Sequence, residues 1–125
     1  MATINLTKDD FRSTVEDHDI VLVDFWAEWC GPCKAFGPIY EKVSEQHTDV
    51  TFGKVDTDVE QELGAGFGIR SIPTLMAFRE GIMVFSQAGA LPEAAVQDLI
   101  SQIKGLDMDD VRRQVVEHEA QHADA

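Results

Sequence analysis

Both cysteines of the chain lie in the stretch Phe25 to Phe36, which reads FWAEWCGPCKAF. This stretch joins two patterns: residues 20–27, IVLVDFWA, are almost all apolar, and the residues from Gly31 to about His47 carry apolar side chains at helical spacing. A continuous apolar run rich in β-branched and aromatic residues is typical of a strand covered on both faces. The sequence therefore predicts a buried strand followed at once by a helix, with the cysteines where the helix begins.

Two cysteines at this spacing are compatible with half of a metal site, a structural disulfide, or a pair of thiols that closes and opens. A structural zinc ion needs four ligands, and the chain has no further cysteine. We expect a cytoplasmic protein, because the N-terminus lacks the basic start and apolar run of a signal peptide and no later segment is apolar for long enough to span a bilayer. Since cytosolic thiols are kept reduced, a reactive pair is favoured over a permanent disulfide.

The predicted helix start gives the two thiols different properties. Free backbone N–H groups and the helix dipole favour a negative sulfur there, so Cys30 should form a thiolate more readily than a cysteine in a flexible chain. Cys33 lies where its backbone N–H and its own S–H can point back at that sulfur. Gly31 permits another backbone to approach, and Pro32 stiffens the turn without removing a helical hydrogen bond. Pro38, inside the helix, is expected to kink it.

Composition limits the organisation of the chain and its partners. Its 125 residues, 44% of them hydrophobic, suffice for one domain with a single core. The formal charge of −13, from 23 acidic and 10 basic residues, repels nucleic acid and anionic membrane surfaces. We expect neither as a partner, and we expect a monomer.

The order of the predicted elements indicates the fold. A βαβαβ half followed by a hairpin and a helix predicts a mixed sheet with helices on both faces. The expected elements are a short strand at 2–5, a helix from Thr7 to Asp17, strands at 20–27 and 50–56 with the helix 31–47 between them, a short helix at 57–66, a hairpin at 73–89 that turns at Arg79, Glu80 and Gly81, and a helix at 91–105.

The last 20 residues, 106–125, lie beyond the point at which this architecture is complete. Asp107 can cap a helix, and Met108, Val111 and Val115 form a narrow apolar stripe on it. We expect a surface helix that frays toward Ala125 and docks on the body through this stripe or serves another protein.

Several motifs together resemble the thioredoxin family: WCGPC (Trp29 to Cys33) within VDFWAEWCGPCK, then KVDTD, GIRSIPTL and QAGAL, in matching order over about residues 4–105. The resemblance implies an α/β thioredoxin fold, a central mixed five-stranded sheet flanked by four helices, here with an extra C-terminal helix. The domain would span residues 1–105, and the extension residues 106–125. The implied activity is that of a protein disulfide reductase, a redox electron carrier with a reversible Cys30–Cys33 disulfide and no bound cofactor. Its implied partners are disulfide-containing proteins and a thioredoxin reductase that draws on NADPH.

The resemblance also implies roles for single residues. Cys30 would be the attacking thiol and Cys33 the resolving thiol. Asp24 would serve as acid and base for Cys33, with Lys54 nearby. From the residues alone, an acid on this apolar strand is desolvated, which raises its pKa, whereas an aspartate at a solvated strand edge would not be.

A substrate surface follows from the same resemblance. The family has a cis-proline loop beside its cysteines, which SIPTL resembles, so we expect a cis Ile72–Pro73 bond although such bonds are rare for X–Pro pairs in general. Trp26 would support the site structurally, as would Pro38. The expected docking residues share an apolar or uncharged character: Trp29, Gly31, Pro32, Ile72, Pro73, Gly89 and Ala90.

A second motif, HEAQH from His118 to His122, matches the H-E-x-x-H pattern of zinc proteases. Such a site also needs a third ligand and a substrate groove, and only three residues follow the motif in this sequence. We expect a solvated helix end that binds metal weakly at most.

Two other classes of function remain open. A binding module would hold a partner through the docking surface or the extension, with its redox chemistry incidental. A disulfide oxidant or isomerase would share the fold. Gly31 and Pro32 resemble the reducing subgroup, with potentials near about −270 mV against about −120 mV for a strong oxidant.

Overall fold

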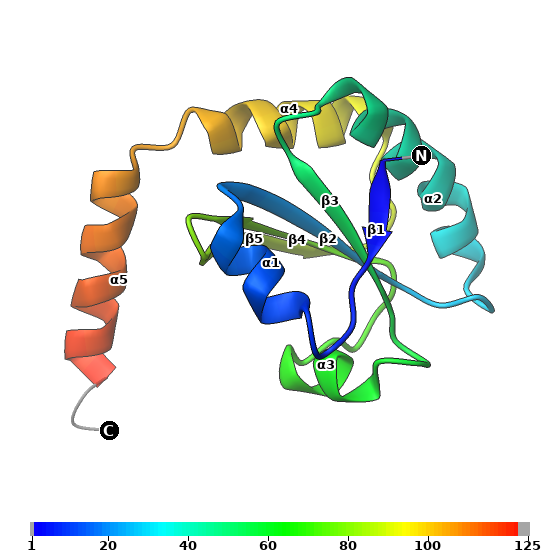
Figure 1. The fold of residues 1–125 in the computed structure, drawn as a ribbon, viewed down its shortest axis with the longest axis horizontal. Coiled ribbons are helices and arrows are strands. Elements are labelled where there is room, and N and C mark those ends of the chain that lie inside the picture. Colours follow the sequence, from blue (N-terminus) through cyan, green and yellow to red (C-terminus); the bar gives the residue numbers. More distant parts are fainter. Residues whose placement is uncertain (1, 123–125) are drawn as a thin grey trace.

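The computed structural model describes residues 2–122. Its sheet has five strands in the order β1-β3-β2-β4-β5, with β1, β3 and β2 parallel and β4 and β5 antiparallel to their neighbours. Figure 1 shows helices on both sides of this sheet, so the predicted mixed α/β architecture is confirmed. The elements are β1 (Thr3–Asn5), α1 (Phe11–Asp17), β2 (Ile20–Trp26), α2 (Gly31–Gln46), β3 (Thr51–Asp56), α3 (Gln61–Gly66), β4 (Thr74–Arg79), β5 (Ile82–Ala88), α4 (Glu93–Lys104) and α5 (Met108–His122).

The central strand β2 is buried on both faces, as its apolar sequence predicts. Leu22 lies in a core with side chains of α2 and α4, including Phe36 and Ile100. The neighbouring Val21 and Val23 lie in a second core with side chains of α1. Because side chains alternate along a strand, β2 supplies both cores at once. Its carboxyl end, from which the chain enters α2, is thereby held in place by both layers.

Two helices begin later than predicted. α1 begins at Phe11 rather than near Thr7, and α3 begins at Gln61 rather than at Thr57. Before α1, the Thr7 N–H donates to Asp10 Oδ1 at 2.7 Å, and the Asp9 N–H donates to Thr7 Oγ1 at 3.3 Å. Short polar side chains offer the backbone local hydrogen bonds that compete with a helix, so residues 8–10 form a turn first. α2 agrees closely with prediction and runs unbroken through Pro38; the kink expected there stays a prediction.

The predicted hairpin turn is present between β4 and β5. Glu80 has a φ of 52° and Gly81 a φ of 80°, both in the left-handed region. Two such residues in a two-residue loop match the right-handed twist of the flanking strands. This turn also carries the contacts that hold the C-terminal helix.

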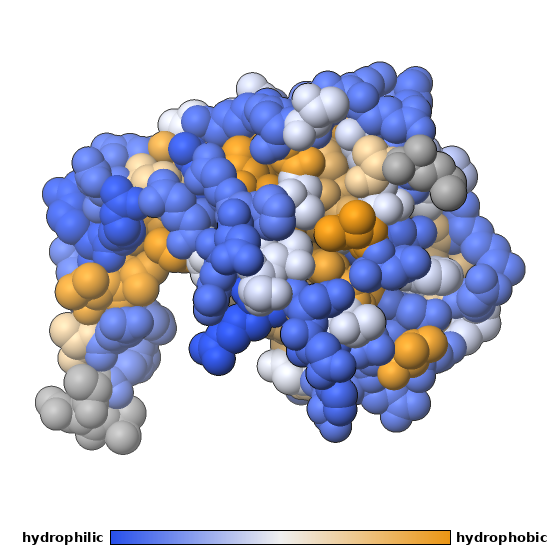
Figure 2. Space-filling view, in the orientation of Figure 1, coloured by the Kyte–Doolittle hydropathy of each residue, from blue (hydrophilic) through white to orange (hydrophobic). Residues whose placement is uncertain are grey.

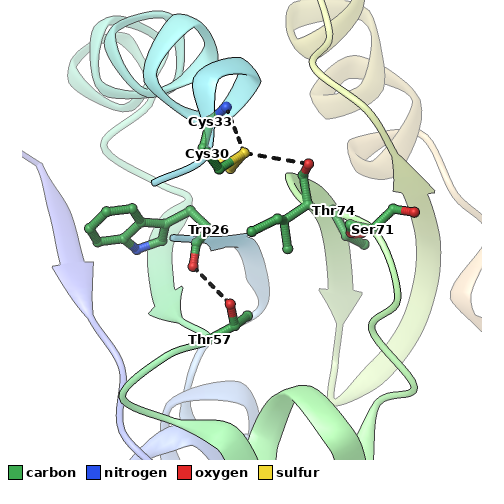
Figure 3. The surroundings of a disulfide bond; sticks show 7 residues. Trp26, Cys30, Cys33, Thr57, Ser71 and Thr74 are labelled. Carbon is green, nitrogen blue, oxygen red and sulfur yellow. Dashed lines mark hydrogen bonds between the residues drawn. A yellow bond between two sulfur atoms is a disulfide. The ribbon is translucent and has the colours of Figure 1, made fainter. Parts of the chain in front are cut away.

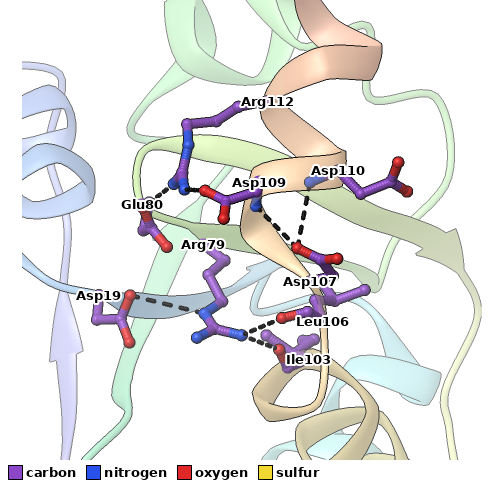
Figure 4. A network of polar contacts seen from close by, with 9 residues as sticks. All are labelled: Asp19, Arg79, Glu80, Ile103, Leu106, Asp107, Asp109, Asp110 and Arg112. Carbon is purple, nitrogen blue, oxygen red and sulfur yellow. Dashed lines mark hydrogen bonds and ion pairs between the residues drawn. The ribbon is translucent and has the colours of Figure 1, made fainter.

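Two arginines connect the sheet to α4 and α5 (Figure 4). Arg79 donates from Nη1 to the carbonyl oxygens of Ile103 at 2.6 Å and Lys104 at 3.2 Å, at the C-terminus of α4, where free carbonyls attract a cation. Arg112 in α5 pairs with both Glu80 and Asp109. These contacts fix the start of α5 against the hairpin.

The C-terminal extension docks only at its beginning. As expected, Asp107 caps α5, because its Oδ1 accepts from the N–H groups of Asp109 at 3.1 Å and Asp110 at 3.3 Å. Met108 is buried, but the helix then runs away from the sheet (Figure 1). The predicted fraying falls on residues 123–125, outside the described residues. The division at Gly105 stays a prediction.

Replacing Arg79 with methionine tests the link between sheet and helix. The variant keeps an apolar stem but leaves the end of α4 without its donor, so the free energy of unfolding should fall by about 1–3 kcal/mol. Chemical denaturation measures this. Arg113→Met is the control, because the Arg113 side chain is 70% exposed and its partner Asp110 lies on the same helix. An equal loss in both variants would contradict the assigned role of Arg79.

Candidate active site

The two cysteines lie where β2 passes into α2. Cys30 is the N-cap residue of α2, and its Sγ accepts a hydrogen bond from the Cys33 N–H at 3.2 Å (Figure 3). The two residues form a disulfide with their Cα atoms 5.2 Å apart. Both are buried, with 3% and 4% of their surfaces exposed. The predicted arrangement, with one sulfur capping the helix and a second within bonding distance, is present.

The loop before β4 lies against Cys30. The Ile72–Pro73 peptide bond is cis, as the resemblance implied. The Ile72 carbonyl oxygen lies 3.5 Å from the Cys30 Sγ. The Gly89 N–H donates to the Pro73 carbonyl oxygen at 2.8 Å, which ties the end of β5 to the same loop. Three segments distant in sequence therefore meet around one sulfur.

The predicted docking residues differ in how much surface they offer. Trp29 is 70% exposed and is the largest apolar side chain at the site. Ile72 is half-buried, whereas Pro73 is buried and so lies beneath the surface rather than forming it. The remaining four are exposed: Gly31, Pro32, Gly89 and Ala90.

One part of the surface was not identified from the sequence. A pocket of about 360 Å³ lies beside Trp29 and Ile72, and its lining includes Gln61 and the exposed Arg70. Arg70 stands two residues before Ile72 within GIRSIPTL, so its position beside the cis-proline loop was the available signal. Gln61 gave no such signal, because it comes from α3 and reaches the pocket only in the folded chain.

Asp24 is buried in β2, the central strand of the sheet. Only 1% of its surface is exposed, and neither carboxylate oxygen has a hydrogen-bond partner among the described residues. Burial raises its pKa to about 7 from an ordinary value of 3.8, while the positive charge of Lys54 acts in the opposite direction. The alternative of a solvated strand-edge aspartate is therefore wrong.

Lys54 and Trp26 lie beside Asp24 on the sheet. Lys54 is opposite Asp24 in the pairing of β2 with β3. Its Nζ lies 4.6 Å from the centroid of the Trp26 ring, a cation–π distance. The Trp26 carbonyl oxygen accepts hydrogen bonds from Thr57, from the backbone N–H at 2.9 Å and from Oγ1 at 3.2 Å (Figure 3). Trp26 thus contacts Lys54 through its ring and the segment that follows β3 through its carbonyl oxygen.

The second motif, HEAQH, lies on α5. The His118 and His122 rings have centroids 4.2 Å apart on α5, the helix that Figure 1 shows on the opposite side of the molecule from α2. Within residues 2–122, no cluster of three or more potential ligands from His, Cys, Asp and Glu is arranged to hold a metal ion. Across the same residues, none of the helices combines the length and the apolar character that a membrane crossing requires.

Asp24→Asn provides a test of the buried carboxyl group. Because the folded pKa of Asp24 lies above the ordinary value, its protonation stabilises the fold below about pH 4, and this contribution is lost as the pH rises through 7. The free energy of unfolding of the variant should therefore increase relative to that of the wild type as the pH rises from 4 to 8, by at most about 4 kcal/mol. Denaturant titrations at several pH values measure the difference. Glu117→Gln, at an exposed position, is the control; a difference that stays flat for Asp24→Asn as well would show that its carboxyl titrates normally.

Comparison with known proteins agrees with this geometry. The family model described as Thioredoxin matches residues 2–102. The putative thioredoxin 2 of Streptomyces coelicolor is 59% identical over 120 residues, which cover 96% of this chain and 90% of that protein. The thioredoxin of Haemophilus influenzae is 40% identical over 101 residues, 79% of this chain and 94% of that one.

Solved structures give the same result. The structure of a mutant thioredoxin from Halobacterium salinarum NRC-1 superimposes with a TM-score of 0.76 at 36% identity, covering 81% of this chain and 89% of that chain. Sequence, fold and cysteine geometry agree. The chain therefore belongs to the thioredoxin family of protein-disulfide oxidoreductases and carries out dithiol–disulfide exchange through its redox-active Cys30–Cys33 pair.

Proposed function

We propose that this exchange runs toward reduction of disulfides in other proteins, with Cys30 as the attacking thiol. The observation that carries the proposal is the Cys33 N–H donated to the Cys30 Sγ at the start of α2. That N–H and the helix dipole stabilise a negative sulfur at Cys30. Cys30 and Cys33 are about equally buried, with 3% and 4% of their surfaces exposed, so this hydrogen bond rather than exposure distinguishes Cys30 as the first nucleophile.

The proposed reaction takes two steps. The Cys30 thiolate attacks one sulfur of the substrate disulfide, a mixed disulfide forms, and the other substrate sulfur leaves as a thiolate that takes up a proton. The Cys33 thiolate then attacks the Cys30 sulfur, which breaks the mixed disulfide and releases the second substrate thiolate. Two electrons have passed to the substrate, and the Cys30–Cys33 disulfide remains.

Asp24 is proposed as the acid and base of the second step. The buried Cys33 must lose its proton before it attacks, and a carboxylate with a pKa of about 7 can accept a proton near neutral pH. The two carboxylate oxygens have no hydrogen-bond partner within the described part of the chain, so they are available to a water molecule that relays the proton. Lys54 would hold the pKa of Asp24 within this range, since its charge opposes the effect of burial.

The exposed residues around Cys30 are proposed to bind an extended substrate segment. Trp29 supplies apolar area, and the Ile72 backbone lies beside the sulfur, where an extended segment can pair with it. The surface is small and mostly uncharged, so it suits many disulfide-containing proteins and distinguishes little among their sequences. The buried Pro73 would support this surface from beneath. The rim of the surface would be formed by four exposed residues: Gly31, Pro32, Gly89 and Ala90.

Continued turnover requires an electron donor for the Cys30–Cys33 disulfide. We propose a thioredoxin reductase that draws on NADPH, acting on a monomer in the cytoplasm without a bound cofactor. Support comes from the thioredoxin relatives and from the reducing conditions under which a dithiol of this kind can be maintained.

Cysteine variants separate the two roles in an insulin-reduction assay with a dithiol donor. Cys30→Ser should show no turnover, since the attacking sulfur is gone. Cys33→Ser should accumulate a mixed disulfide with insulin, visible on a non-reducing gel and released by added dithiol. Trapping by Cys30→Ser instead would reverse the assignment, and absence of turnover by the wild type would refute the reductase proposal.

Asp24→Asn should slow the second step without blocking the first. In the wild type, the rate of product release from the mixed disulfide should rise through pH 7 as the Asp24 carboxyl ionises. The variant should lose this rise and be slower by about a hundredfold or more at pH 7.5, the lower end of the range for general acid–base catalysis. Stopped-flow tryptophan fluorescence measures both steps. An unchanged pH profile for release would remove Asp24 from the mechanism.

A further inference from the structure

A groove lies between α5 and the edge strand β5, away from the redox site. It has a volume of about 520 Å³. Figure 2 shows a hollow between α5 and the rest of the protein, with apolar residues gathered along α5 beside it. The strand wall consists of Ile82, Met83 and Val84, the helix wall includes Val111 and Val115, and Leu106 lines the groove from the connection between α4 and α5. We call this the α5 groove.

The α5 groove is built by the fold rather than left by a loose tail. Arg112 pairs with Glu80, and Arg79 donates to the carbonyl oxygen of Leu106 at 3.4 Å, so the corner between α4 and α5 is fixed (Figure 4). Met108 is buried at that corner. Beyond it, Val111 and Val115 stay only half-buried. The apolar stripe of α5 therefore faces a space that the chain itself leaves open.

The charge of the α5 groove determines what it attracts. Its acidic lining residues are Asp107, Asp110 and Glu119, of which Asp110 is paired with Arg113 on the same helix. Within residues 2–122, no lysine or arginine is among the residues that line it. The whole chain carries a formal charge of −13. A second copy of this chain would thus bring like charge to an acidic groove, whereas a basic partner is attracted.

The strand wall restricts the shape of the occupant. Ala77 pairs with Phe85, but Phe78 pairs with Met83, so Val84 is an extra residue in β5. Such a bulge bends the edge and interrupts the row of backbone groups that an added strand would need. The opposite wall is a helix whose apolar residues Val111 and Val115 are one turn apart. This arrangement favours side-chain packing by another helix, anchored at helical spacing.

We propose that the α5 groove binds a basic amphipathic helix of a partner protein. Apolar side chains of that helix pack against Val111, Val115 and Met83, and its lysines or arginines face Asp107 and Glu119. In Figure 1, α5 and the start of α2 lie at opposite ends of the molecule, so an occupant leaves the Cys30–Cys33 pair accessible. The α5 groove thereby tethers the redox site to a partner without using the substrate surface.

The test uses the reduced full-length chain and a fluorescent synthetic helix of about 18 residues, long enough to form several turns. One peptide has leucine on one face and lysine on the other; a matched peptide has glutamate in place of lysine. Fluorescence anisotropy should show binding of the lysine peptide, weakening as salt is added, and no binding of the glutamate peptide. Equal binding of both peptides, or of neither, would overturn the proposal.

Two adjacent valines distinguish groove binding from attraction to the acidic surface in general. Val115→Glu places a charge in the α5 groove and should weaken binding by about tenfold or more, as expected for losing a buried apolar contact. Val116→Glu adds the same charge at a position that is 63% exposed and should bind like the wild type. Equal affinities for the two variants would contradict the proposal.

A variant in β5 shows whether Val115→Glu weakens binding through the groove or by unfolding α5. Met83 is 51% exposed, so Met83→Glu leaves the cores intact and should weaken peptide binding as Val115→Glu does. All three variants should reduce insulin at the wild-type rate. Sedimentation completes the test: a wild-type dimer that Val115→Glu dissociates would assign the α5 groove to a second copy and overturn the proposal.

Discussion

The hydrogen bond from the Cys33 N–H to the Cys30 Sγ depends on where α2 begins, and that point is fixed by the sheet. β2 is buried by helices on both faces, so its carboxyl end cannot shift without disturbing two cores. The chain then has only residues 27–30 before the first turn of α2. A sulfur at that position can accept a hydrogen bond from the backbone N–H groups that have no partner within the helix at its start. The same position brings Cys30 within reach of the Ile72 carbonyl and within disulfide distance of Cys33.

The sheet that holds this helix also carries a costly group. Asp24 is buried without a hydrogen-bond partner among the described residues, and burial of a carboxylate disfavours its charged form. An asparagine or an apolar residue would serve the fold better. A carboxyl group with a pKa of about 7 can take up and release protons at neutral pH, which suits a group that takes part in proton transfer. Lys54, held over the Trp26 ring, keeps a positive charge close enough to moderate the effect of burial.

The sequence predicted those features that depend on local patterns. The apolar run of β2, the helical spacing after Gly31 and the hairpin turn at Glu80 and Gly81 each have a signature within a few residues. The cis Ile72–Pro73 bond has no such signature, because the base rate opposes it, and it was expected only through the resemblance carried by SIPTL. The starts of α1 and α3 were placed too early, since polar turns and first helical turns share the same residue types.

Features that depend on contacts between distant elements could not be predicted. The residues around Arg79, REGI from Arg79 to Ile82, do not indicate that its side chain reaches the end of α4. Its partners there are backbone carbonyl oxygens, which every residue has, so no sequence motif marks them. The pocket beside Trp29 draws Gln61 from one element and Arg70 from another. The apolar stripe of α5 is predicted from the helical spacing of its residues. Whether another element covers this stripe depends on the angle between α5 and the rest of the domain. Arg112 and Glu80 help to set that angle.

We propose that the start of α2 makes the Cys30 sulfur more anionic than that of an ordinary cysteine. The most direct measurement is the rate at which iodoacetamide alkylates Cys30 at pH 7 in the Cys33→Ser variant, which retains the backbone N–H at position 33. The reference is the same variant unfolded in denaturant at the same pH. The folded protein should react about tenfold faster or more, because a thiolate is the reacting species. Equal rates in the folded and unfolded chain would contradict it.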